Sequence, residues 1–197
     1  VEARHPQPDT RSLSPDALAG QSQPAELTVT SAPVSQPSAA SLEADRLSQL
    51  AQHQADQNNL DAAQELLHQA LEADPMFHTA RLQLAILLQR RGQFSQAIRE
   101  YESVLALKPD NTTAWRNLAL AYMTAKEYPK ARVTLQKLLA IEAANPQAWL
   151  DLGDVEMLSG RPDAARQNWQ KALLLAKSDP DLAARANKRL AAYIKGK

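Results

Sequence analysis

Few side chains of this sequence have types that could take part in catalysis or hold a metal ion. Asp151 and Asp154 lie three residues apart with Glu156 nearby, a pattern that could hold a cation or serve as acid and base. On one helix face, the same spacing more often forms a solvated or groove-lining surface. The four histidines do not have the spacing of metal ligands: His5, His53, His68 and His78. We therefore predict no catalytic residue, no metal site, no cofactor and no enzyme activity.

The composition excludes further classes of site and partner. The 5 glycines are scattered, which excludes a glycine-rich phosphate loop, and the 0 cysteines exclude disulfides, thiolate zinc sites and cysteine nucleophiles. Because 22 Lys and Arg balance 22 Asp and Glu, the net field is weak and nucleic acid is not the expected partner. No apolar run is long enough to span a membrane, so we expect no membrane insertion by this chain, although an anchor upstream of Val1 stays open.

The chain divides into two parts by composition. Residues 1–41 hold six of the 12 prolines and no aromatic residue, which predicts an extended or disordered Pro/Ser/Gln-rich arm. Residues 13–18 could form one helical turn and residues 26–30 alternate like a short strand. Both features are either local bias in a linker or docking segments that order on a partner or on the folded part. In the second case the apolar anchors would be Leu13, Leu18, Leu27 and Val29.

Residues 42–197 contain a repeated pattern with a period of 34 residues. The units are 44–77, 78–111, 112–145 and 146–179, and no gap is needed to align them. A large apolar residue and a very small one recur together at Leu50–Ala51, Leu84–Ala85, Leu118–Ala119 and Leu152–Gly153. A second small row, followed four residues later by a bulky one, is Ala63–Leu67, Ala97–Tyr101, Ala131–Leu135 and Ala165–Trp169. Small residues let two helix axes approach while large ones fill the space beside them, so each unit is expected to be an antiparallel helix pair.

Residues that favour turns and helix starts support two helices in each unit. A turn between the helices is predicted at Asn58, Gly92, Lys126 and Gly160. The start of the second helix is predicted at Asp61, Ser95, Pro129 and Asp163. After the fourth unit, residues 180–195 predict one more amphipathic helix that caps the end of the array.

At these residues the chain resembles the tetratricopeptide repeat (TPR) family, whose pattern places Trp, Leu, Gly, Tyr, Ala, an aromatic and Pro at set intervals. The third unit matches at Trp115, Leu118, Ala119, Tyr122 and Ala131. The fourth matches at Trp149, Leu152, Gly153, Ala165 and Trp169. The resemblance implies an all-α, right-handed superhelical solenoid of four helix-turn-helix units plus the capping helix. It also implies that the first helices line a concave groove that binds an extended or helical segment of a partner protein.

By the family pattern, the partner-binding groove is expected at places on the first helix of each unit. The second to fourth units contribute Leu82, Ile86, Arg90, Arg116, Asn117, Leu120, Met123, Gln147, Leu150, Asp151, Asp154, Met157 and Leu158. This set has an apolar floor between polar edges, with Arg90 and Arg116 expected to meet acidic groups of the partner. The Lys, Asn and Arg set with which some TPR domains clamp a C-terminal carboxylate is not present, apart from Asn117.

Two non-enzymatic functions remain open from the sequence. The leading hypothesis is an adaptor that holds a partner protein while a larger complex assembles. Its expected location is periplasmic or otherwise extracytoplasmic, after removal of a signal or anchor, because the chain begins at Val1 rather than Met and the arm resembles a spacer. A cytoplasmic location is the alternative. The second hypothesis is a structural subunit that forms a homo-oligomer or filament when its arm docks on a neighbouring copy.

Overall fold

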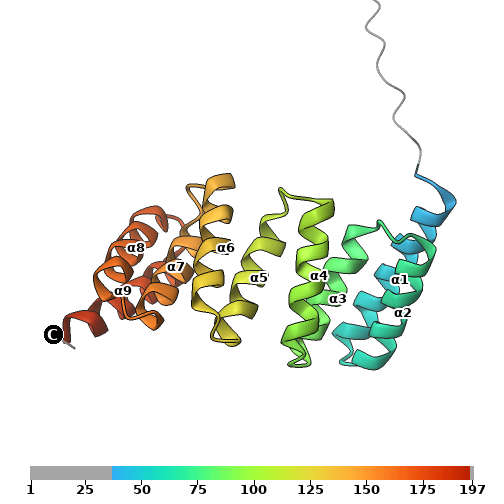
Figure 1. Cartoon of the computed structure of the whole chain (residues 1–197), viewed down its shortest axis with the longest axis horizontal. Coiled ribbons are helices and arrows are strands. Elements are labelled where there is room, and N and C mark those ends of the chain that lie inside the picture. The colour runs from blue at the N-terminus through green and yellow to red at the C-terminus, as the bar shows by residue number, and fades with distance from the viewer. Residues whose placement is uncertain (1–36, 196–197) are drawn as a thin grey trace, which may run out of the picture. The chain divides into compact units, whose positions relative to one another are not determined.

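The computed structural model describes residues 37–195, which form an all-α array of helices (Figure 1). No strand occurs in this range, so the all-α prediction is confirmed there. The docking anchors predicted between Leu13 and Val29 lie outside the described residues. The helices are α1 (Ala39–Asp56), α2 (Leu60–Ala73), α3 (His78–Arg90), α4 (Phe94–Leu107), α5 (Thr112–Thr124), α6 (Tyr128–Ile141), α7 (Pro146–Leu158), α8 (Pro162–Leu175) and α9 (Pro180–Lys195).

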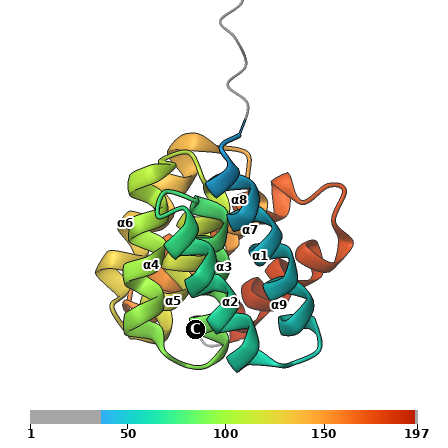
Figure 2. The same ribbon diagram turned by 90° about the vertical axis from the view of Figure 1, so that its right-hand side faces the viewer.

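The helices pair as the 34-residue period predicts. Each odd-numbered helix from α1 to α7 contacts the even-numbered helix that follows it, and each even-numbered helix then contacts the first helix of the next unit. Figure 2 looks along this row from the α1 end, so that the units lie behind one another. Every unit therefore buries its apolar faces against its neighbours, which is how a repeat array obtains a continuous core.

The small and bulky rows of the sequence form the interior of each helix pair. The alanines of both small rows are buried, and so are the bulky residues that follow them: Leu67, Tyr101, Leu135 and Trp169. A methyl group or a hydrogen at the small positions lets the second helix come close, and the large side chain then fills the remaining space. The predicted packing is confirmed in all four units.

The turn between the two helices of a unit is formed the same way four times. The residue at the turn has a positive φ in each unit: 63° at Asn58, 76° at Gly92, 60° at Lys126 and 73° at Gly160. The sequence prediction of these turns is confirmed, and Lys126 adopts a left-handed conformation that glycine occupies without strain. The predicted start of the second helix is one residue late, because the helices begin at Leu60, Phe94, Tyr128 and Pro162.

Helix α1 begins inside the segment that composition assigned to the arm. The predicted arm ended at residue 41, but the helix starts at Ala39. Ser38 has extended backbone and its hydroxyl oxygen accepts a hydrogen bond from the Ser41 amide at 3.1 Å, which caps the first turn. Residues of a linker-like composition are therefore drawn into the helix by one good capping residue.

One member of the bulky rows departs from the pattern. Leu84, Leu118 and Leu152 are buried, whereas Leu50 in α1 is 42% exposed. Helices α3, α5 and α7 each contact the second helix of the preceding unit, but in the described part of the chain no helix precedes α1. The period therefore predicts the residue type but not its burial at the end of the array.

Gly153 and Trp169 offer a direct test of how a small and a bulky residue pack together within one unit. A Cβ atom at residue 153 would overlap the indole ring of Trp169, so Gly153→Ala should destabilise the fold by about 1–3 kcal/mol through overpacking. Two of the three units with alanine at this place carry a leucine, Leu67 or Leu135, where this unit has Trp169, so Trp169→Leu in the G153A background should recover part of the loss. Chemical denaturation of the wild type, both single variants and the double variant measures this coupling. Strictly additive losses would contradict the account.

Candidate functional site

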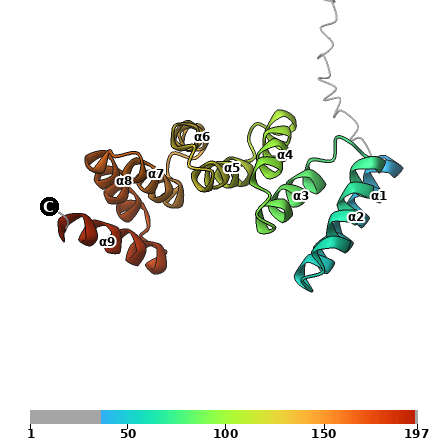
Figure 3. The ribbon, with the colours of Figure 1, turned by 60° about the horizontal axis from the view of Figure 1, so that its bottom comes forward.

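The first helices of successive units lie next to one another and form one side of the array. Helix α3 contacts both α1 and α5, and α9 contacts α7 in the same manner. In Figure 3, α4 and α6 lie on one side of the row and α3 and α9 on the opposite side. Helix α9 thus takes the place of the first helix of a fifth unit, and we call this side of α1, α3, α5, α7 and α9 the concave face.

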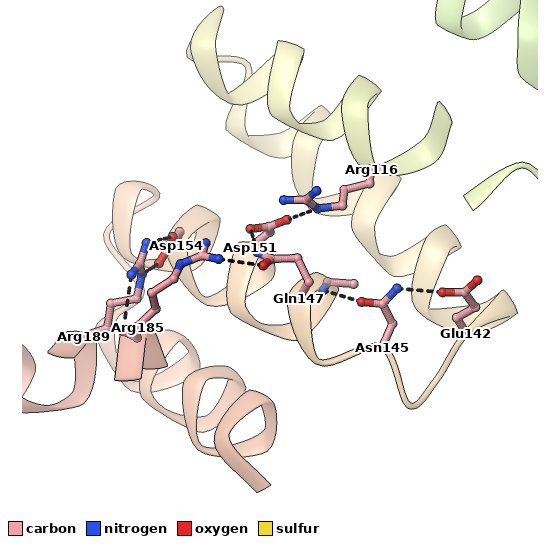
Figure 4. A network of polar contacts seen from close by, with 9 residues as sticks. Arg116, Glu142, Asn145, Gln147, Asp151, Asp154, Arg185 and Arg189 are labelled. Carbon is pink, nitrogen blue, oxygen red and sulfur yellow. Dashed lines mark hydrogen bonds and ion pairs between the residues drawn. The ribbon is translucent and has the colours of Figure 1, made fainter. Parts of the chain in front are cut away.

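A chain of polar contacts joins three helices of the concave face (Figure 4). From α5, Arg116 Nε donates to Asp151 Oδ2 on α7 at 2.9 Å, and Gln147 Nε2 donates to the other carboxylate oxygen at 2.6 Å. From α9, an Nη of Arg185 donates to Gln147 Oε1 at 2.9 Å. The contacts fix α5, α7 and α9 relative to one another through side chains rather than through backbone.

Asp151 is the buried centre of this chain of contacts. Its residue is only 4% exposed, and both carboxylate oxygens accept hydrogen bonds from neighbouring side chains. Burial raises the pKa of the Asp151 carboxyl, and the Arg116 guanidinium opposes this increase. Asp151 is therefore an internal ion-pair partner and not a carboxylate that faces solvent.

A second ion pair ties α9 to α7. Arg189 donates from Nε to Asp154 Oδ1 at 2.5 Å and from an Nη to Oδ2 at 2.7 Å, which is the two-pronged geometry that guanidinium and carboxylate groups favour. The indole N–H of Trp169 on α8 donates to the same Oδ1 at 2.9 Å. Asp154 thus accepts hydrogen bonds from one residue of α8 and one residue of α9.

An open apolar pocket of about 670 Å³ lies beside the Asp154–Arg189 pair. Its size is in the range of pockets that hold a small ligand or a few side chains of a peptide. Leu158 at its edge is 53% exposed, although leucine is usually buried. The lining residues come from α5, α7, α9 and the α8 region: Met123, Asp154, Met157, Leu158, Pro162, Trp169, Arg189, Ala192 and Tyr193.

The structure brings four of the predicted groove residues to this pocket, namely Met123, Asp154, Met157 and Leu158. At the other end, Ile86 and Arg90 border a small pocket between α1 and α3 of about 70 Å³. The remaining predicted places with partial exposure are on α3, α5 and α7: Leu82, Arg116, Asn117, Leu120 and Gln147.

One predicted groove residue is wrong, and two others have partners within the chain. Leu150 is 0% exposed and belongs to the core cluster with Trp169 and Leu182, because this side of α7 faces α8 and α9. Arg116 was expected to meet an acidic group of the partner, but it pairs with Asp151 of its own chain. Asp151, also predicted for the groove, is nearly buried and has both oxygens occupied.

Sequence reasoning missed five lining residues of the pocket: Pro162, Trp169, Arg189, Ala192 and Tyr193. The sequence pattern places Trp169 in a bulky packing row and predicts residues 180–195 as a capping helix, and it assigns neither of them to the groove. A signal was present, because Pro146 and Pro180 are 34 residues apart and begin α7 and α9 respectively. Extending the period by one half-unit predicts that α9 continues the concave face.

Comparison with known proteins agrees with this architecture. Family models described as "Tetratricopeptide repeat" match residues 54–100, 82–146 and 134–183. The chain belongs to the tetratricopeptide repeat family. TPR arrays are in general scaffolds for protein–protein interaction and are generally non-catalytic. In residues 37–195, no three His, Asp or Glu side chains converge in a way that could bind a metal ion, and no helix has the length and apolarity to cross a membrane.

Solved TPR structures share the fold at low sequence identity. A crystal structure of MamA protein is 20% identical with a TM-score of 0.70, covering 78% of this chain and 82% of that one. PilF of Pseudomonas aeruginosa is 24% identical with a TM-score of 0.68, covering 80% and 72%. A thermophilic TPR protein of Thermus thermophilus, TTC0263, is 24% identical with a TM-score of 0.63, covering 75% and 81%. A comparison with curated proteins finds no match. At these identities the likeness shows the fold alone.

The raised pKa of Asp151 predicts a pH dependence of stability. A carboxyl whose pKa is higher in the folded state binds its proton more tightly there than in the unfolded chain. This carboxyl therefore stabilises the fold fully at pH values below its pKa in the unfolded chain. The stabilisation is lost as the pH rises through its pKa in the folded protein. Wild type should therefore lose stability relative to Asp151→Asn as pH rises from about 3 toward neutrality.

Denaturant titrations of the wild type and D151N across pH measure this difference. The variant Arg116→Gln removes the guanidinium that opposes the increase in the pKa of Asp151. The loss of stability with rising pH should therefore be larger in R116Q than in the wild type. A wild type that gains stability relative to D151N on going to neutral pH would contradict the assigned cause.

Proposed function

We propose that this TPR chain is a non-enzymatic adaptor whose concave face binds a segment of a partner protein while a larger complex assembles. The observation that supports it is the apolar pocket between α5, α7, α8 and α9. Two methionines and a largely exposed leucine stand at its wall, and methionine side chains adapt to irregular apolar partners. An anchor of the partner, such as a leucine or an aromatic side chain, would enter there.

The charges around the pocket suggest what flanks that anchor. Arg116 and Arg189 are paired with the two aspartates, whereas within residues 37–195 the Arg185 guanidinium donates to the neutral amide of Gln147 and forms no ion pair. Arg90 is exposed farther along the same face. At its α7–α9 end the concave face thus retains the positive charge of Arg185 once its own ion pairs are counted, so the proposed partner segment combines an apolar anchor with an acidic residue.

A second pocket, of about 600 Å³, provides the control. It lies between α4, α5 and α6 and includes Val133, which is 47% exposed. None of the predicted groove residues lines it. We therefore expect a photo-cross-linking amino acid at Leu158, introduced in the native host, to capture one predominant protein, while the same group at Val133 does not. Equal capture from both positions, or none from Leu158, would count against the adaptor proposal.

A charge at the pocket should weaken binding without unfolding the chain. Leu158→Asp is expected to lower affinity for the captured partner at least about tenfold, because an apolar anchor would then meet a carboxylate. The matched variant Val133→Asp, at a residue of similar exposure, should bind as wild type does. Calorimetry with the purified partner measures both, and a normal affinity of L158D would exclude this pocket.

We further propose that the adaptor works on the exported side of a membrane. The support is the spacer-like composition of residues 1–41, which would carry the TPR array away from an anchor. Protease treatment of intact spheroplasts of the native host tests it: digestion of the chain is the expected result, and protection until the cells are lysed would favour the cytoplasmic alternative.

A further inference from the structure

The two ends of the helix array leave apolar side chains uncovered within residues 37–195. At one end, α1 exposes Leu42 and Leu50, which lie eight residues apart on one face of the helix. At the other end, Leu174 of α8 and Ile194 of α9 are exposed, the latter by 72%. These helices lie at opposite ends of the row in Figure 1. Neither patch belongs to the concave-face pocket.

The repeat register shows why Leu50 is uncovered. The equivalents of Leu50 in α3, α5 and α7 are buried, and each of these helices contacts the second helix of the preceding unit. Helix α9 takes the place of a first helix, and α5 at that place contacts the second helix of its own unit, α6. The α1 end of the described array therefore presents Leu50, whose equivalents are buried in the inner units, and the α9 end adds Leu174 and Ile194 at places that are exposed in every unit.

The charge of the array is strongly asymmetric. Residues 39–77 carry seven Asp and Glu against one Arg, whereas residues 78–195 carry eighteen Lys and Arg against eleven Asp and Glu. Helix α9 alone carries Arg185, Lys188, Arg189 and Lys195 against Asp181. The α1 end of one copy and the α9 end of another thus attract each other, while like ends repel.

One polar atom at the α9 end has no partner in the described residues. Arg166 Nε on α8 is buried without a hydrogen bond, and its guanidinium lies 6.0 Å from the centre of the Tyr193 ring. A shallow pocket here is formed by Arg166, Gln170, Leu190, Tyr193 and Ile194. The Arg166 residue as a whole is partly exposed, so its guanidinium places a positive charge beside this pocket.

We propose that a second copy of this chain docks its α1 edge, formed by Leu42, Glu43 and Leu50, on the α9 edge, formed by Arg166, Leu174 and Ile194. Glu43 lies seven residues before Leu50 and so shares its face, and its present partner Arg46 is a solvent-exposed one that can be exchanged. The two surfaces differ, so the contact is head-to-tail and leaves a free α1 edge and a free α9 edge on every assembly. Copies of the chain then join into open rows, independently of what the concave face binds.

Sedimentation velocity of the full 197-residue chain over a range of concentrations tests this contact. We expect association that increases with concentration and weakens as salt is added. Leu50→Asp and Ile194→Asp should each lower the association constant at least about tenfold, and V133D should not change it. Because all three residues are exposed, thermal unfolding should show that each variant remains folded.

A mixture of the two edge variants gives the sharpest result. L50D retains a normal α9 edge and I194D retains a normal α1 edge, so an equal mixture should form dimers and nothing larger. A wild-type chain that stays monomeric at low salt would overturn the proposal. So would a mixture that stays monomeric, or association that persists in the L50D/I194D double variant, since the latter would point to residues 1–36 or to another face.

Discussion

The close approach of two helices at alanine or glycine is the constraint on which the rest of the structure depends. A unit of two short helices cannot bury enough apolar surface alone, so stability comes from repeating the same contact along the chain. Each unit meets the requirement with small residues on both helices and one bulky side chain between them. In the Gly153–Trp169 pair, the largest of the bulky residues packs against the smallest of the small residues, so the two side chains compensate in size within one unit.

The concave face follows from this packing. Because second helices cover one side of the row, the first helices are left to line the other, and α9 continues that line at the end. Asp151 and Asp154 then have a structural use: each carboxylate accepts from an arginine of an adjacent first helix. The ion pairs hold α5, α7 and α9 in place, and the apolar pocket opens beside the one nearest the end of the array.

The sequence was sufficient for the fold and for part of the site. The period, the small rows and the four turns were predictable because they recur at fixed places and are imposed by helix geometry. The burial of Leu150 and the internal ion pair of Arg116 were not predictable, because one family position can face the groove or the core depending on which helix follows it. The role of α9 in the pocket depends on Arg189 reaching Asp154 across 35 residues, a distance that no short motif encodes.

The central claim is that the concave-face pocket at the α7–α9 end holds the partner. The 3 methionines of the chain allow a direct measurement, because Met123 and Met157 line this pocket and Met76 is exposed outside it. In a methyl NMR spectrum of methionine-labelled chain, addition of the captured partner segment should shift the Met123 and Met157 signals and leave Met76 unchanged. Unchanged Met123 and Met157 signals under saturating partner would contradict the claim.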